Sequence, residues 1–360
     1  MAANGDMLRL ARQRRGFHQT EAARLLGIEQ PVLSRFENGL SEIKDDVVAK
    51  AARAYDFPIE FFRQNDPIYG APVSVHPMWR RKADVSMREM ESVVAELNLR
   101  VMHLRRLLES VEVVNTSDLP RLDIDEYKDP ERIAGLVRAH WRVPSGPIKN
   151  LTALVEKAGV LVTHSGLRGA SISGVTFAVP GMPPLIVLNE DQPSDRMRFT
   201  LAHELAHLVM HRFPTPSMEQ EAHAFAVALL VPAADVRSYF AGKKIELSLM
   251  AALKPEWKVS MAALIMRAHG LGFTAKNQHE YLWKQMSSRG YRLREPPELD
   301  FTRELPSVVP QLLSFHLSGL GYSRSDLATL LSVHEIELVR LYGMGDAGGE
   351  PKKPRLSILK

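Results

Sequence analysis

Hydrophobic residues recur along most of the chain with the spacing of helices, and one region has the spacing of strands. In residues 7–62, 87–110 and 129–158, and again from residue 196 onward, apolar side chains return every three or four positions. This spacing predicts helices that bury one face. Three short apolar runs between Gly and Pro turns predict strands, namely Val160–His164, Ile172–Val179 and Leu185–Leu188. The pattern predicts a multidomain, mainly helical protein with a small α+β core.

The pattern and the local composition divide the chain into five segments. The first is a compact helical unit, and the second is a linker rich in Pro and Gly that leads into a long helix. An α+β core, a helical C-terminal region and a polar, basic tail follow, and we expect the tail to be disordered. The predicted bounds are residues 1–66, 67–112, 113–240, 241–345 and 346–360.

Composition narrows the chemistry that the chain can perform. The 360 residues include no cysteine, which excludes disulfides, thiol catalysis, iron–sulfur clusters and cysteine-ligated zinc. Any metal must therefore be held by His, carboxylate or water. No apolar run has the length of a membrane span and the N-terminus has no signal-peptide core, so we expect a cytoplasmic protein with no membrane partner. The net charge of +4 and the pI near 9.2 permit nucleic-acid binding without requiring it.

Residues 7–62 contain glycines and a proline at the positions where short helices joined by tight turns begin and end. The first predicted helix ends at Gly16, the second covers Gln19–Leu26 and stops at Gly27, and the third has Pro31 in its first turn. Residues of suitable size let the second and third helices cross closely; they are Ala23, Gly27, Ile28, Leu33 and Phe36. These features indicate a helix-turn-helix unit.

This segment resembles the Cro/cI-type (XRE) helix-turn-helix family over its whole length. The resemblance implies a recognition helix at about Gln30–Glu37, with Gln30, Ser34 and Arg35 facing the major groove of double-stranded DNA and Gln19 near a phosphate. Four arginines on or beside the first helix favour DNA binding, namely Arg9, Arg12, Arg14 and Arg15. The alternative is that these arginines are a solvated face and that the helices bind protein.

A long helix is predicted at Met87–Ser110. Apolar residues form a stripe along it at spacings of three and four, namely Met90, Val94, Leu97, Val101, Leu104 and Leu108. The stripe is too short to define a coiled coil. It can dimerise the chain, as palindromic operators favour for this class of helix-turn-helix protein, or it can pack on the rest of the chain.

The C-terminal region contains a partial repeat of the helix-turn-helix sequence. Residues 321–333 follow residues 16–28 position by position, and Leu338 and Leu341 repeat Leu33 and Phe36. At the reading positions, however, Glu335 and Val339 replace Gln30 and Ser34. We therefore expect a helix-turn-helix-shaped unit that packs rather than one that reads DNA.

The helix at residues 196–211 carries the chain's most specific chemical pattern. His203 and His207 stand four residues apart, so on a helix both imidazoles leave the same face and can bind one zinc ion. Glu204 can then act as general base on a metal-bound water. A catalytic zinc site needs a third protein ligand. Glu219 is the first candidate, because a Pro-containing loop returns it to the histidines in a helix that Ser217 begins with a predicted capping box.

Other residues near this helix are weaker candidates. Glu221 ranks second as a ligand, and His223 can orient a ligand by a second-shell hydrogen bond or replace Glu219. His211 is expected to lie too far along the helix to reach the ion and to end it near the last carbonyls. Candidate oxyanion donors are His164, Arg196 and His269. The strand Leu185–Leu188 is expected to offer an exposed edge to an extended substrate.

Residues from about Asp129 to Pro297 resemble the ImmA/IrrE family of zinc metallopeptidases. The matching stretches are Pro147–Leu151, Ile186–Asn189, Arg198–His207, Glu219–Ala226, Leu229–Pro232, Ser260–Leu264 and Glu295–Pro296. The resemblance implies a zincin-like fold, with His203, His207 and Glu219 as zinc ligands and Glu204 as general base. His223 departs from the family, which usually has Asn at that position.

The fusion of the two resemblances implies a DNA-binding regulator whose zinc endopeptidase domain cleaves a repressor or a similar partner protein, in transcriptional control or a stress response. Two alternatives stay open. The metal domain can be a sensor or a structural unit in a transcription factor or antitoxin without turnover, or both ends can be protein-interaction surfaces. A structural site has no need of Glu204, which favours the peptidase.

Overall fold

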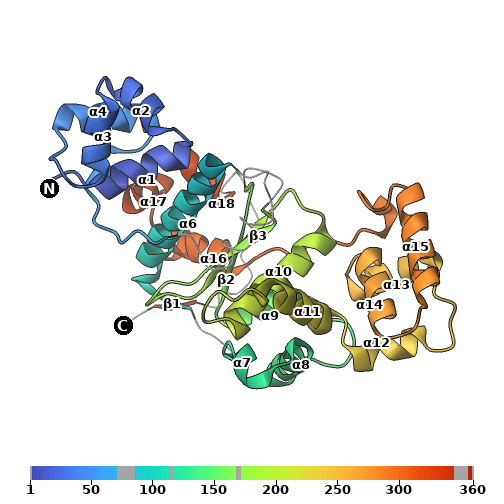
Figure 1. Ribbon diagram of the computed structural model, residues 1–360. Helices are drawn as coiled ribbons and strands as arrows, with labels where there is room; N and C mark the ends of the chain where they lie inside the picture. Colours follow the sequence, from blue (N-terminus) through green and yellow to red (C-terminus); the bar gives the residue numbers. More distant parts are fainter. Residues whose placement is uncertain (1, 71–85, 114–116, 168–171, 344–355, 359–360) are drawn as a thin grey trace.

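The structure is a computed structural model that describes residues 2–70, 86–113, 117–167, 172–343 and 356–358. Figure 1 shows an N-terminal helical unit, a central part built around a small sheet, and a helical lobe at the far end. The mainly helical, multidomain architecture expected from the sequence is confirmed. The basic cluster at residues 79–82 lies outside the described residues.

Four α-helices and one 3-10 helix form the N-terminal unit. They are α1 (Gly5–Arg15), α2 (Gln19–Leu26), α3 (Gln30–Glu37), α4 (Asp45–Tyr55) and η1 (Ile59–Arg63). The helices α1 and α2 end at Gly16 and Gly27, whose φ values of 72° and 67° are left-handed, a conformation that glycine adopts without steric cost. The turns predicted at these two glycines are present, and α2 and α3 form the helix-turn-helix.

The long helix α6 (Met87–Leu108) is buried inside the chain. Ser86 begins it with a capping box, in which its hydroxyl accepts the N–H of Glu89 and the Glu89 carboxylate accepts the N–H of Ser86. The helix packs against α1 and against α17 (Arg324–Leu331), and Leu97 and Leu104 of its apolar stripe are fully buried. Of the two roles expected for the stripe, the structure shows packing within the chain.

Three strands form the central sheet in the order β2-β4-β3. They are β2 (Leu161–Ser165), β3 (Gly174–Phe177) and β4 (Leu185–Asn189). The central strand β4 pairs in parallel with β2 and antiparallel with β3. The expectation that Leu185–Leu188 is an exposed edge is therefore wrong, because this segment is hydrogen-bonded on both sides and buried throughout. The edge strand next to it is β3.

The two faces of the sheet belong to different hydrophobic cores. Leu161, Leu185 and Val187 face a core made with the N-terminal unit, α6 and the C-terminal helices. Val162, Ile186 and Leu188 face the core of the central part and the far lobe. Since successive side chains of a strand point to opposite faces, the sheet joins the helix-turn-helix side of the molecule to the side that carries the His-Glu-x-x-His helix.

Helices on the second face of the sheet build the central part and the far lobe. The central part has α7 (Ile124–Tyr127), α8 (Pro130–His140), α9 (Leu151–Lys157), α10 (Ser194–Met210), α11 (Met218–Leu230) and α12 (Ala233–Phe240). The lobe has α13 (Leu247–Trp257), α14 (Met261–Gly270), α15 (Lys276–Ser288) and the short η2 (Pro297–Leu299). Among the described residues, no helix is both long and apolar enough to cross a membrane.

The last helices return to the N-terminal unit, as Figure 1 shows. They are α16 (Val308–Ser314), the π-helix η3 (Phe315–Gly319), α17 and α18 (Glu335–Tyr342). The helices α17 and α18 have the expected helix-turn-helix shape, with Ser332 left-handed between them (φ 53°). The single C-terminal region expected at residues 241–345 is therefore divided, because its first half packs with the central part and its second half with the N-terminal unit.

A second, two-stranded sheet includes part of the tail. The strand β1 (Val111–Val113) pairs antiparallel with β5 (Leu356–Ile358). Disorder was expected for the whole tail, and this is wrong for residues 356–358. Leu and Ile in alternate positions favour a strand once a partner strand is available.

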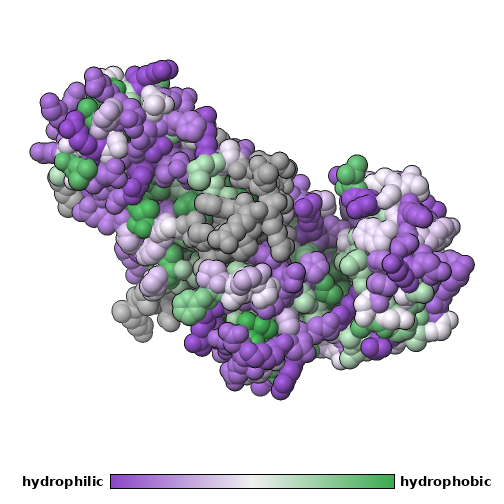
Figure 2. All heavy atoms as spheres, in the orientation of Figure 1, coloured by the Kyte–Doolittle hydropathy of each residue, from purple (hydrophilic) through white to green (hydrophobic). Residues whose placement is uncertain are grey.

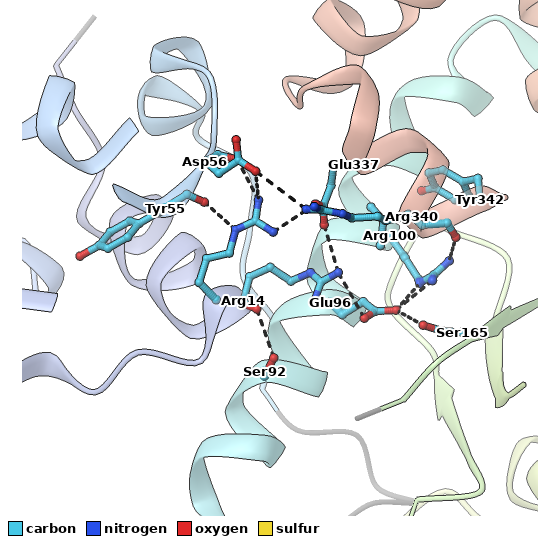
Figure 3. A network of polar contacts seen from close by, with 12 residues as sticks. Arg14, Tyr55, Asp56, Ser92, Glu96, Arg100, Ser165, Glu337, Arg340 and Tyr342 are labelled. Atoms are coloured by element: carbon cyan, nitrogen blue, oxygen red, sulfur yellow. Dashed lines mark hydrogen bonds and ion pairs between the residues drawn. The ribbon is translucent and has the colours of Figure 1, made fainter. Parts of the chain in front are cut away.

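Polar groups buried between these elements join the parts of the molecule (Figure 3). Arg14 of α1 donates to Glu337 of α18 at 3.0 Å. Arg100 of α6 is fully buried and donates to Glu96 of the same helix and to the backbone oxygen of Leu341. Glu96 also accepts the Ser165 hydroxyl from β2. The network therefore connects the N-terminal unit, α6, α18 and the central sheet.

Candidate metal centre and DNA-binding surface

Two imidazoles and one carboxylate meet between α10 and α11. The Nε2 atoms of His203 and His207 lie 3.3 Å apart. The Glu219 carboxylate approaches both, with Oε2 3.4 Å from Nε2 of His203 and Oε1 3.4 Å from Nε2 of His207. One helical turn separates the two histidines, so both rings leave the same face of α10. The structure thus brings together the three residues expected as ligands.

The loop before α11 returns Glu219 to the histidines. Pro214 and Pro216 interrupt the helical pattern, and α11 then packs along α10. The capping box expected at Ser217 is wrong, because the Ser217 side chain makes no capping hydrogen bond. Its backbone is already helical, with φ −94° and ψ −10°, whereas a capping residue adopts an extended conformation.

The donor set fits a zinc ion. In a tetrahedral site with bonds of about 2.0–2.1 Å, neighbouring ligand atoms lie about 3.3 Å apart, which matches the separations of 3.3 and 3.4 Å found here. Within the described part of the chain, Oε1 of Glu219 is buried without a hydrogen-bond partner, and a cation would satisfy it. Two histidines and one carboxylate also leave a fourth position open, as catalytic zinc sites do.

Charge complementarity supports the same grouping. Burial by itself raises the pKa of Glu219, but contact with His203 and His207 outweighs it and lowers this pKa to about 2. Burial lowers the pKa of His203, but the carboxylates of Glu219 and Glu204 outweigh it and raise this pKa. Glu219 is therefore held as a carboxylate, the form that ligates a metal.

Glu204, the expected general base, is fully buried beside the ligands. Its Oε2 accepts a hydrogen bond of 2.7 Å from the hydroxyl of Thr176 on β3. Its Oε1 is buried and has no hydrogen-bond partner among the described residues. One oxygen is thus fixed by the sheet and the other is left to accept a proton. Thr176 could not be predicted as a partner of Glu204, since it lies 28 positions away in a strand with no chemical motif.

The side chain of His211 connects His207 to Glu221. Its Nδ1 lies 3.0 Å from Nδ1 of His207, and its Nε2 lies 3.1 Å from Oε2 of Glu221. As expected, His211 ends α10 and is absent from the ligand cluster, but its side chain is fully buried. Burial and His207 lower the pKa of His211 to about 4, against the opposing effect of Glu221. Glu221 thus contacts His211 rather than the ligand atoms.

His223 and the three candidate oxyanion donors lie outside the cluster of His203, His207 and Glu219. His223 is exposed and its ring packs 5.0 Å from that of Phe199. His164 lines a small cavity with Arg198 and Glu304, and His269 stacks on His279 in the far lobe. Arg196 lines a larger cavity beside the ligands. No oxyanion donor is therefore assigned.

In the N-terminal unit, most of the arginines that were expected to form a basic face make ion pairs within the protein. Arg12 forms a buried ion pair with Glu37 at 2.6 Å, and Arg14 and Arg15 pair with Glu337 at 3.0 and 3.1 Å. The expectation that these arginines face DNA or solvent is therefore wrong, although Arg9 stays half-exposed and pairs with Asp6.

The expected reading positions are more accessible. Arg35 is exposed, and Ser34 and Gln30 are half-buried on α3. Gln30 donates to Gln19 at 2.8 Å, and Gln19 donates to Glu37 at 2.9 Å. The two glutamines therefore fix α2 and α3 against each other at the surface that would meet DNA.

Comparison with known families agrees with this geometry. Residues 8–62 match the helix-turn-helix family model, and residues 155–269 match the peptidase M78 family model, described as the IrrE N-terminal-like domain. The chain therefore contains an XRE-type helix-turn-helix segment followed by an IrrE/ImmA-like peptidase segment, as the sequence predicted. No curated protein matches the chain.

Proposed function

We propose that this protein is a DNA-binding transcriptional regulator whose second domain is a zinc-dependent endopeptidase that cleaves a repressor or another regulatory protein. One observation carries the proposal. The ligand atoms of His203, His207 and Glu219 converge at tetrahedral spacing beside Glu204, whose Oε1 has no hydrogen-bond partner among the described residues. A metal site with only a structural role has no need of such a buried carboxylate oxygen.

Each residue of the site would have a separate role in peptide hydrolysis. A zinc ion bound there would act as a Lewis acid on the peptide carbonyl and on a water molecule. Oε1 of Glu204 takes a proton from the attacking water and passes it to the leaving amine. Thr176 holds Oε2 of Glu204 at 2.7 Å and so fixes the direction of Oε1.

The helix-turn-helix would direct the peptidase to DNA. We infer that Gln30, Ser34 and Arg35 contact the major groove and that Gln19 lies near a phosphate, since α3 presents these side chains on the accessible side of the unit. A homodimer on a palindromic operator fits this class, with the two copies joined elsewhere than along the buried stripe of α6.

The experiment compares cells that contain the wild-type protein with cells that contain the Glu204→Gln variant. Bound zinc, new protein N-termini and operator occupancy are measured in parallel. We expect equal zinc content and operator occupancy, with new N-termini only in the wild type. Unchanged N-termini with intact zinc and DNA binding would instead identify a regulator whose metal domain is a sensor or a structural unit.

A further inference from the structure

A cavity of about 470 Å³ lies directly beside the candidate metal centre. Phe199, one turn before His203 on α10, forms part of its wall, as do His223 and Val227, one and two turns after Glu219 on α11. The cavity therefore continues the same helix faces that carry the ligands. One helical turn is about 5.4 Å, so a substrate residue in the cavity lies within about two residues of a bond held at the metal.

The inner wall of the cavity is apolar. Phe199 and Val227 line it together with Val259, which lies just before α14, Met266 in the middle of α14, and Trp283 of α15. Figure 2 shows hydrophobic surface in the hollow between the central part and the far lobe. A volume of this size accepts a large apolar side chain together with its neighbours.

The three acidic side chains of the cavity are paired with two basic ones, the buried Lys254 and the exposed Arg294, which lies 3.6 Å from Asp300. Nζ of Lys254 lies 2.7 Å from Asp195, 2.8 Å from Glu295 and 3.6 Å from Asp300. Burial lowers the pKa of Lys254, but its hydrogen bonds to Asp195 and Glu295 outweigh it and raise this pKa. Glu295 also accepts the N–H groups of Met261 and Ala262, at the start of α14.

Two arginines of the cavity, in contrast, have no carboxylate partner among the described residues. Arg196 is exposed on the first turn of α10, and no carboxylate of the described residues lies within 4.0 Å of its guanidinium. Arg292 is also exposed, and its guanidinium lies 5.4 Å from the centre of the Trp283 ring, a cation–π contact that leaves its charge uncompensated. The cavity is thus an apolar pocket with positive charge at its rim.

We propose that this cavity is the specificity pocket of the peptidase and that it takes a polypeptide segment with a large apolar residue next to an acidic one. The apolar side chain lies against Phe199, Val227 and Met266, and the carboxylate meets Arg196 and Arg292. This inference rests on the proposed peptidase function, because the segment it describes is the part of the substrate beside the cleaved bond.

Peptide binding to the full-length Glu204→Gln protein loaded with zinc tests the pocket without requiring turnover. The probe is a peptide library with randomised positions, and the retained peptides are sequenced. We expect enrichment of Leu, Phe or Met followed or preceded by Asp or Glu. Adding Arg196→Gln and Arg292→Gln should lower the acidic enrichment at least tenfold and leave the apolar preference, because the inner wall is unchanged.

The Met266→Trp variant tests the predicted preference of the cavity for a large apolar side chain. Met266 is 50% exposed, so the larger side chain fills the cavity without disturbing the core, and the preference should shift to small residues. The control is Arg289→Gln, an exposed arginine just after α15 that does not line the cavity. No enrichment, or enrichment that none of the cavity variants changes, would overturn the proposal. Failure of the peptidase function is seen separately, as a wild-type protein that binds the same peptides but never cleaves them.

Discussion

The Nδ1 atom of His207 lies 3.0 Å from the Nδ1 atom of His211. The hydrogen bond leaves Nε2 of His207 directed at His203 and Glu219. Glu221 holds the other side of the His211 ring at 3.1 Å. A ring nitrogen fixed in this way sets the tautomer and orientation of a metal-ligating histidine.

Replacing His211 with Ala should weaken zinc binding by about 10–100-fold, because His207 loses the group that orients it. Zinc affinity is measured by competition with a chromophoric chelator. The matched control is His223→Ala, since His223 is exposed and packs on Phe199, and its affinity should stay within about threefold of wild type. Equal losses in both variants would contradict the role of His211.

Replacing Thr176 with Val should lower kcat about tenfold without reducing zinc content. The substitution keeps the size of the side chain and removes a hydrogen bond to the Glu204 carboxylate, worth about 1.5 kcal/mol or more. Turnover and bound zinc are measured on the same preparations. Thr163→Val is the control, because its hydroxyl accepts from Arg100 on the other side of the sheet. A lower zinc content with unchanged turnover per zinc would argue against positioning of Glu204.

Replacing Glu337 with Gln should destabilise the protein by roughly 2 kcal/mol at pH 7, since two arginines lose a buried partner. Burial by itself raises the pKa of Glu337, but Arg14 and Arg15 outweigh it and hold this pKa below its ordinary value of 4.5. A depressed pKa stabilises the fold above the unfolded value, and the gain disappears as the pH falls through the folded value.

The difference between wild type and Glu337→Gln should therefore be large at pH 7 and shrink below pH 4.5. Urea unfolding at pH 7 and at pH 3 measures it. Asp6→Asn, which breaks the exposed pair with Arg9, is the control and should change stability by less than about 1 kcal/mol. A difference that is the same at both pH values would contradict an ionic contribution from Glu337.

Replacing Arg35 with Ala should weaken operator binding by about 1–3 kcal/mol and leave zinc content unchanged. Arg12→Gln should instead destabilise the N-terminal unit, because Arg12 forms a buried pair with Glu37. Fluorescence anisotropy with operator DNA and thermal unfolding separate the two effects. As a control, Val339→Ala in the C-terminal repeat should not change DNA binding. If Arg35→Ala bound DNA normally, α3 would not be the recognition helix.

The cluster of His203, His207 and Glu219 could be predicted because local geometry brings these side chains together. A four-residue spacing puts His203 and His207 on one face of any helix, and the Pro-containing loop returns Glu219 to that face. The same local logic identified the turns at Gly16 and Gly27, where a left-handed residue is needed.

The errors arose where distant segments decide the outcome. Leu185–Leu188 is an unbroken apolar run, which suits a strand covered on both faces better than an edge, but the order of the strands is set by tertiary contacts. The pairing of Arg14 with Glu337 joins residues 323 positions apart, so no local pattern indicates that the arginines face inward. Thr176 was missed for the same reason.

Hydrolysis in water labelled with ¹⁸O tests the central claim most directly. Zinc-loaded wild-type protein and the Glu204→Gln variant are each incubated with the soluble protein fraction of cells that lack the chain. Mass spectrometry then identifies new C-termini. The account predicts new termini that carry one ¹⁸O atom in the wild-type sample and none with Glu204→Gln. New labelled termini of equal abundance with both proteins, or none with either, would contradict it.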